Sequence, residues 1–173
     1  MKRLMALLLV LCMAVGFAAC STPETPSPQG TTPNVGNPGD PEAYYFTYNG
    51  TDIRLNGDMQ VILNALGEPK KYTEETSCAF TGLDKTYTYD SFILQTYPQG
   101  DKDYVYCFWF VDDLVQTNEG IRIGDDQAKV ESAYGAEAYN GSNAYILTEG
   151  DTTFTVILDE GVVTSIQYAV SIG

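Results

Sequence analysis

The chain has 173 residues, and its 23 Asp and Glu residues outnumber its 9 Lys and Arg residues, which gives a net charge of −14 at neutral pH. A chain this acidic repels phosphate backbones, so nucleic acid is not an expected partner. It contains no histidine, which excludes a Ser-His-Asp triad, a histidine-ligated zinc site and histidine acid–base catalysis. No nucleophile elbow, P-loop or dinucleotide-binding motif is present either. We therefore expect a protein that is not an enzyme and carries no cofactor.

The first residues are typical of an export signal. Lys2 and Arg3 precede an uncharged apolar run, residues 4–17, and Ala18 and Ala19 follow it. The run is too short to span a bilayer, because a transmembrane helix needs about 20 apolar residues. Residues 1–19 are therefore predicted to be a signal peptide that is removed on export.

The sequence Ala18-Ala19-Cys20 resembles the lipobox of bacterial lipoproteins, although Phe17 stands where leucine is usual. In that family the cysteine is diacylated and becomes the mature N-terminus. The resemblance implies lipid, palmitate included, on Cys20 and a place on the extracytoplasmic face of the cell membrane. Two acyl chains suffice for stable anchoring. Ordinary secretion with Cys20 as a plain thiol, or an uncleaved anchor, are the alternatives.

Residues 20–42 are expected to form a tether. Apart from Val35, the segment after Cys20 has no aliphatic residue, and it is rich in Pro, Ser, Thr, Gly and Asn. It cannot bury enough apolar surface to offset its backbone entropy, and Pro-rich linkers extend by about 3 Å per residue. The expected role is a spacer of several nanometres.

Residues 43–173 are predicted to fold, as two related units. The sequence Ile53-Arg54 recurs as Ile121-Arg122, 68 positions later. In both places the pattern predicts a short strand, an Asp N-cap, a helical apolar stripe and a glycine stop at Gly67 or Gly135. The expected boundaries are 43–117 for the first repeat and 118–173 for the second.

Alternating side chains follow each predicted helix. Residues 104–111 have aromatic and aliphatic residues on both faces, and residues 153–170 predict a hairpin that turns at Asp159-Glu160-Gly161. The expected fold class is α+β. It consists of two tandem units, each a helix followed by an antiparallel meander, with the helices packed on one face of the sheet.

The helix end Leu66-Gly67-Glu68-Pro69, followed by strands, resembles the BamE (SmpA/OmlA) and β-lactamase-inhibitor-like (BLIP-like) superfamily. There the helix-plus-meander unit often occurs in tandem, on secreted proteins and lipoproteins. The stretch from Asp90 to Asp113 is also similar to uncharacterised lipoproteins of Gram-positive bacteria. Neither resemblance implies functional residues for this chain.

Cys78 and Cys107 would remain available for a disulfide after export and lipidation. In a simple meander another strand would separate them, and two strand spacings exceed the roughly 7 Å Cα limit of a disulfide. The alternative is two buried thiols that act as small apolar side chains.

Two groups of residues are candidates for binding. Acidic pairs could in principle attract calcium, but no EF-hand spacing is present and turns or helix caps explain them, so no metal site is expected; the pairs are Asp101 with Asp103, Asp112 with Asp113, and Asp125 with Asp126. Aromatic residues on the surface could bind a protein or stack on a sugar; the candidates are Tyr44, Tyr45, Tyr87, Tyr89 and Tyr97.

These observations favour a membrane-anchored, non-catalytic module that binds a protein of the cell envelope. That function predicts an exposed aromatic or apolar patch. The alternative is a carbohydrate-binding or cell-wall-binding lipoprotein, which predicts a groove of aromatic rings with polar neighbours. An enzyme would instead require a pocket that holds carboxyl groups with raised pKa.

Overall fold

The computed structural model describes residues 44–171. The predicted signal peptide, the lipidation site Cys20 and the predicted tether lie outside the described residues. Between residues 44 and 171, neither helix has the length and apolar character needed to cross a membrane.

A two-stranded hairpin begins the described part of the chain. Strand β1 (Tyr45–Tyr48) pairs with β2 (Thr51–Arg54) through a turn at Asn49 and Gly50, whose φ angles are 49° and 76°. Positive φ at both central residues is the signature of the type I′ turn, which matches the twist of a hairpin. Phe46 and Ile53 are partners across the hairpin, and both are fully buried.

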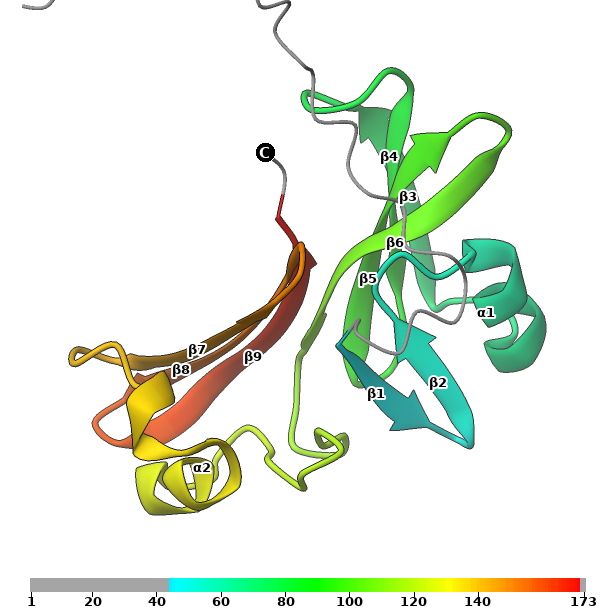
Figure 1. Cartoon of the computed structure of the whole chain (residues 1–173). Coiled ribbons are helices and arrows are strands. Elements are labelled where there is room, and N and C mark those ends of the chain that lie inside the picture. The colour runs from blue at the N-terminus through cyan, green and yellow to red at the C-terminus, as the bar shows by residue number, and fades with distance from the viewer. Residues whose placement is uncertain (1–43, 172–173) are drawn as a thin grey trace, which may run out of the picture. The chain divides into compact units, whose positions relative to one another are not determined.

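The other seven strands form one antiparallel sheet in the order β3-β4-β5-β6-β9-β8-β7 (Figure 1). Consecutive strands pair as hairpins, except that β6 is joined to β9 in the middle of the sheet. The strands are β3 (Lys71–Thr76), β4 (Leu83–Thr88), β5 (Phe92–Gln99), β6 (Lys102–Phe110), β7 (Ala144–Glu149), β8 (Thr152–Asp159) and β9 (Val162–Val170). The predicted hairpin that turns at Asp159-Glu160-Gly161 is confirmed as β8 and β9.

The two helices begin and end as their sequences predict. In α1 (Met59–Leu66) the side chain of Asp58 accepts a hydrogen bond from the N–H of Gln60, and in α2 (Gln127–Tyr134) Asp126 accepts one from Lys129. These bonds satisfy N–H groups that have no partner within the helix. A short 3₁₀ helix, Ala136–Ala138, follows α2.

The predicted fold class is wrong. The described chain is mostly β, and its strands build one seven-stranded sheet and one two-stranded sheet instead of two tandem helix-plus-meander units. Because β6 pairs with β9, the strands before and after α2 belong to the same sheet. The repeated signals at Asp58 and Asp126 describe helix caps, which are local, and carry no information on which strands pair.

The strand expected at residues 121–123 does not form. Ile121 is fully buried, as a strand residue would be, but its carbonyl accepts from the N–H of Thr117 and its own N–H donates to the Thr117 hydroxyl. Thr117, a loop residue, therefore satisfies the backbone N–H and C=O groups of Ile121, which in a sheet would bond to a neighbouring strand.

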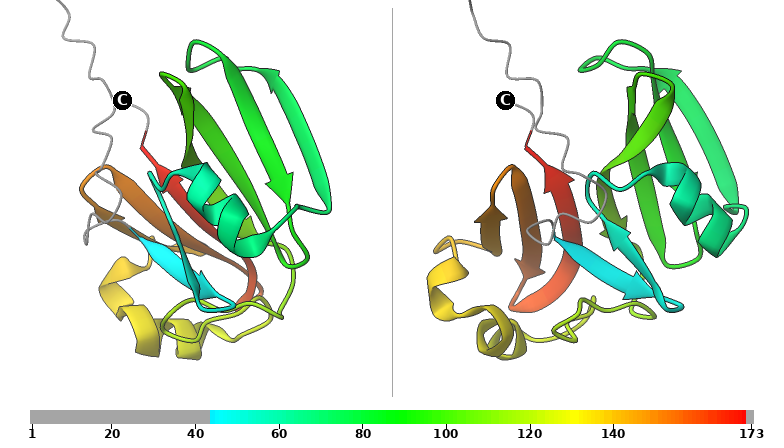
Figure 2. Two further views of the ribbon diagram at one scale, coloured as in Figure 1. Left: turned by 90° about the vertical axis from the view of Figure 1, so that its right-hand side faces the viewer. Right: turned by 45° about the vertical axis from the view of Figure 1, so that its right-hand side comes forward.

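One aromatic core joins the hairpin and the helices to the sheet. The ring of Phe46 lies 4.9 to 5.2 Å from the rings of Phe92, Phe108 and Phe110. Buried side chains of α1 and α2, among them Ile62 and Val130, belong to the same cluster. Figure 2 shows α1 and the hairpin against one face of the sheet. Burial of each large apolar side chain contributes about 1.5 to 3 kcal/mol.

Candidate functional site

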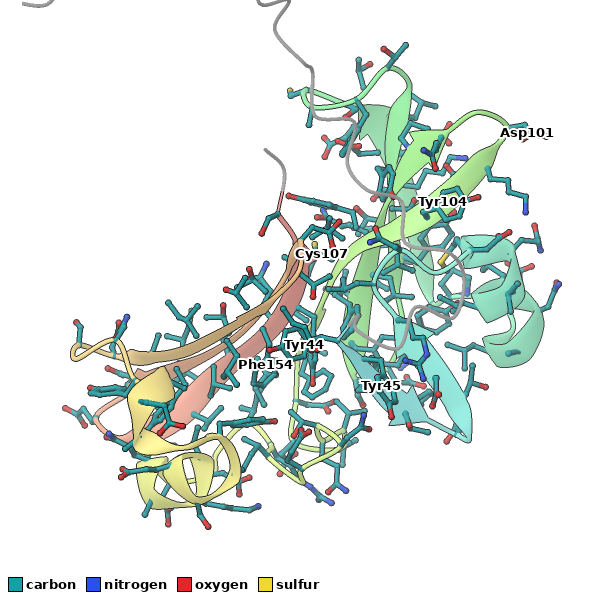
Figure 3. The ribbon with its side chains drawn as sticks, viewed as in Figure 1. Tyr44, Tyr45, Asp101, Tyr104, Cys107 and Phe154 are labelled. Carbon is teal, nitrogen blue, oxygen red and sulfur yellow. The ribbon has the colours of Figure 1, made fainter. Side chains whose placement is uncertain are left out.

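A small cavity of about 200 Å³ opens beside the first described residues. We call it the aromatic recess. It is lined by five aromatic side chains and three polar ones: Tyr44, Tyr45, Tyr134, Phe154, Tyr168, Asn118, Glu119 and Glu149. Figure 3 shows Tyr44, Tyr45 and Phe154 close together.

The sheet supplies the floor of the recess. Phe154 on β8 and Tyr168 on β9 are partners across these strands, and their rings lie 4.7 Å apart. They are 1% and 2% exposed. The floor is therefore rigid, because both rings are locked in the core.

The walls come from the first described residues and from α2. The ring of Tyr44 lies 5.8 Å from that of Phe154, and the ring of Tyr134, the last residue of α2, lies 4.8 Å from it. The Tyr134 hydroxyl is 2.7 Å from Glu119 Oε2, to which it donates, and 2.7 Å from Thr117 Oγ1. These bonds hold the ring and bring one carboxylate to the rim.

The recess has a negative electrostatic character. Burial raises the pKa of Tyr44, and the carboxylates of Glu149 and Glu119 raise it further. Burial also raises the pKa of Tyr134; the hydrogen bond with Thr117 lowers it in part and Glu119 raises it again. The hydroxyls of Tyr44 and Tyr134 therefore stay neutral at physiological pH, and none of the lining residues is a cation.

The ring of one recess tyrosine, Tyr45, already contacts the side chain of Arg54, which lies outside the recess lining. The guanidinium carbon of Arg54 lies 3.8 Å from the centre of the Tyr45 ring, and its Nη2 lies 2.9 Å from a carboxylate oxygen of Asp52. A cation above an aromatic face interacts favourably with the ring quadrupole. Tyr45 is thus placed where its ring faces a guanidinium.

The structure brings together only two of the five tyrosines that the sequence singled out. Tyr44 and Tyr45 are half-buried and line the recess. Tyr87, Tyr89 and Tyr97 are 6%, 7% and 2% exposed, so the prediction that they lie on the surface is wrong.

These tyrosines are buried because their side chains point into the protein. Tyr87 lies on the face of β4 that meets the core, and Tyr89, just after the end of β4, belongs to the same core cluster. Tyr97 follows a register shift between Gln95 and Thr96 in β5, and its hydroxyl donates to Asn56 Oδ1 at 3.1 Å.

Most residues of the recess could not be predicted from the sequence. Tyr134, Phe154, Tyr168 and Glu149 lie on different elements and Glu119 lies in a loop, so no local pattern connects them. One signal was available, because α2 ends in Tyr134 where α1 ends in Leu66. A tyrosine at the end of a helix has a hydroxyl that needs a polar partner.

Four of the six residues in the acidic pairs have structural partners, and one of these, Asp126, caps α2. Asp103 Oδ2 lies 2.7 Å from Lys85 Nζ, Asp125 Oδ2 lies 2.7 Å from Lys129 Nζ, and Asp112 accepts from the N–H of Leu114. Burial alone would raise the pKa of Asp125, but hydrogen bonds from Lys129 and from the N–H of Arg122 outweigh burial and lower it. Asp101 lies at the end of the β5–β6 hairpin (Figure 3). Within the described part of the chain, no three Cys, Asp or Glu side chains gather as a metal site would require.

The two cysteines are not bonded to each other. Cys78 is exposed in the loop between β3 and β4, whereas Cys107 on β6 is 3% exposed. Strands β4 and β5 separate them in the sheet. Burial raises the pKa of Cys107 to about 12, and its thiol donates to Gln95 Oε1 at 3.3 Å.

Comparisons with known proteins give little help. No model of a protein family matches the chain, and no curated protein matches it. A crystal structure of an extracellular protein containing a SCP domain from Bacillus anthracis str. Ames is similar in part, with 13% identity and a TM-score of 0.41. The match covers 65% of this chain and 43% of that one. Likeness at this level supports no conclusion, and the resemblance to the BamE and β-lactamase-inhibitor-like group stays a prediction.

Proposed function

We propose that this chain is an exported lipoprotein, anchored through lipid on Cys20 at the extracytoplasmic face of the cell membrane. Its folded part is a non-catalytic module that binds a basic segment of a partner protein in the cell envelope. The observation that supports this best is the aromatic recess, which has two carboxylates at its rim and no cation in its lining.

The size and chemistry of the recess suit one cationic side chain. A volume of about 200 Å³ is too small for a folded element but admits the end of an arginine or lysine. Arginine fits better, because its planar guanidinium can stack on a ring while its N–H groups reach carboxylates. A cation–π contact contributes about 0.5 to 2 kcal/mol, more as the cation loses its water.

The charge of the chain supports the same partner. Glu119 and Glu149 are exposed at the rim, and the net charge is −14 before any signal peptide is removed. Complementary charge speeds association with a basic partner and makes the rate depend on salt. The tyrosines of the recess and an arginine of the partner are residue types that are enriched in binding hot spots.

The experiment is capture from an envelope extract by the full-length chain, purified in detergent with a C-terminal tag. The wild type is compared with the double variant Glu119→Gln and Glu149→Gln, which removes charge but keeps hydrogen-bond acceptors. Glu75→Gln, an exposed glutamate on β3, is the matched control. We expect a basic protein to be recovered with the wild type and the control and lost with the double variant.

Two results would contradict this function. One is equal recovery of the partner with the double variant, which would exclude the recess carboxylates as the groups that bind the partner. The other is recovery of wall polysaccharide alone, which would favour the carbohydrate-binding alternative. Anchoring is tested separately, because Cys20→Ala is expected to lose both incorporated palmitate and membrane association.

A further inference from the structure

The face of the seven-stranded sheet that points away from the aromatic core has an uncharged middle, while Asp84 lies toward one end of β4 on the same face. Two rows of paired residues cross it from β4 to β7. The row through Trp109 contains Thr88, Ile93, Trp109, Gln167, Thr155 and Ile146. The row through Cys107 contains Thr86, Gln95, Cys107, Ala169, Thr153 and Thr148.

No side chain in these rows is charged, although 18% of the residues of the chain are. Their neighbours along the strands, such as Phe108, Ile166 and Phe154, are buried in the core. Because successive side chains in a strand point to opposite faces, the two rows face outward. Apart from Cys107 they are half-buried or exposed, and the buried side chains of α1 and α2 belong to the core on the opposite face.

A depression of about 310 Å³ lies in the middle of this face. It is lined by Gln95, Cys107, Trp109, Ser165 and Gln167. Gln95 is held in place, because its Nε2 donates to Thr86 Oγ1 and its Oε1 accepts from Cys107 Sγ, both at 3.3 Å. Within the described residues, the exposed amide of Gln167 makes no side-chain hydrogen bond and is free to meet a ligand.

We propose that this face binds a neutral glycan of the cell envelope, with Trp109 and Gln167 as its main contacts. The flat indole ring offers an apolar surface on which the C–H face of a sugar can lie. An amide side chain both donates and accepts hydrogen bonds, as the hydroxyls of a sugar require. The surrounding threonines extend the same chemistry along a chain of sugars.

Charge decides between classes of ligand. The two rows hold no carboxylate that a basic ligand could pair with, and an anionic polymer is repelled by a chain of net charge −14. A neutral ligand with many hydroxyl groups meets neither obstacle. This inference does not depend on the aromatic recess, since the two sites share no residue.

Trp109 makes the test direct, because it is the single tryptophan of the chain. The full-length protein in detergent is titrated with chitohexaose and with cellohexaose while tryptophan emission is recorded. We expect saturable quenching or a blue shift with at least one of these neutral hexasaccharides, and none with polygalacturonate. Gln167→Ala keeps the tryptophan and is expected to weaken binding about tenfold, whereas the control Gln99→Ala, at the end of β5, is expected to bind as the wild type does.

Three outcomes would overturn the proposal. The first is no change in emission with either hexasaccharide at millimolar concentration. The second is equal affinity in Gln167→Ala and Gln99→Ala. The third is a signal that depends on protein concentration in the same way as dimer formation, which would make the face a contact between copies. Retention of glycan binding by the Glu119→Gln and Glu149→Gln double variant separates this result from that of the proposed function.

Discussion

The rings of Phe108 and Tyr168 stack with their centroids 4.4 Å apart and their planes 25° apart, at paired positions on β6 and β9. These two strands pair at only three positions, from Cys107 with Ala169 to Trp109 with Gln167. This short ladder connects the strands that precede α2 with those that follow it. The stacked pair therefore lies where these two sets of strands join into a single sheet.

Phe108→Ala is expected to destabilise the whole described unit. Phe108 is fully buried, and replacement of a buried phenylalanine by alanine costs about 3 to 5 kcal/mol. Urea unfolding followed by circular dichroism and by Trp109 emission should give one coincident transition at a lower midpoint. Val111→Ala, an exposed control, should change stability by less than about 0.5 kcal/mol. Two separate transitions in the wild type would show that the sheet does not act as one unit.

Stability is expected to fall at alkaline pH. Burial raises the pKa of Tyr87, Tyr89 and Tyr97 to about 12, whereas an unfolded chain loses these protons near pH 10. The stabilisation is therefore fully present below about pH 10 and is lost as the pH rises toward 12. Each tyrosine contributes a slope of at most about 1.4 kcal/mol per pH unit.

Urea unfolding at pH 9, 10 and 11, with absorbance at 295 nm to follow tyrosine ionisation, measures this slope. Tyr97→Phe is expected to flatten it. The same variant should lose about 1 kcal/mol at neutral pH, because the hydroxyl that donates to Asn56 is gone. Equal stability of the wild type at pH 9 and pH 11 would contradict the prediction.

Asp58 has two roles that variants can separate. It caps α1, and its Oδ2 lies 2.7 Å from Lys102 Nζ. The hydrogen bond from Lys102 is the largest cause of its lowered pKa, so the stabilisation is present at neutral pH and is lost as the pH falls through that lowered pKa. Asp58→Ala is expected to cost about 1 kcal/mol for the cap in addition to the ion pair. Asp58→Asn should keep the cap and lose only the acid-sensitive part, and equal costs for both variants at neutral pH would exclude a capping role.

Glu160→Asn is expected to stabilise the β8–β9 hairpin. Glu160 and Gly161 have φ angles of 48° and 80°, which is the type I′ geometry that favours Asn-Gly. Asparagine adopts the left-handed region at lower cost than glutamate, so a gain of roughly 0.5 kcal/mol in the free energy of unfolding is expected. Thermal unfolding measures it, with Glu160→Val as the opposite control, since a branched residue should lower the melting temperature.

Local features of this fold were predictable, and long-range ones were not. An Asp cap before each helix and the turn before Val162 depend on a few neighbouring residues, and the sequence indicates them directly, although only the structure selects Asp126 over Asp125. The pairing of Cys107 with Ala169 joins positions far apart in the chain, and no local pattern specifies it. Ile53 and Ile121 stand in similar sequences, but only Ile53 has a strand beside it.

The same distinction applies to the candidate site. The sequence indicates Tyr44 and Tyr45 only as aromatic residues that could lie on the surface. The rest of the aromatic recess assembles from β7, β8, β9, α2 and the loop before α2 only after folding. Tyr97 lies just after a register shift between β5 and β6, and no local pattern in the sequence indicates such a shift.

The outer strand β3 has a consequence for how copies of this protein can coexist. All six of its residues are exposed, and an unpaired strand edge is a template on which another sheet can grow. Three of the six residues, Lys71, Glu74 and Glu75, carry charge. If many copies are confined to one membrane plane by the proposed lipid on Cys20, neighbouring edges would bring these carboxylates together, and their repulsion would keep a crowded layer from joining into a continuous sheet.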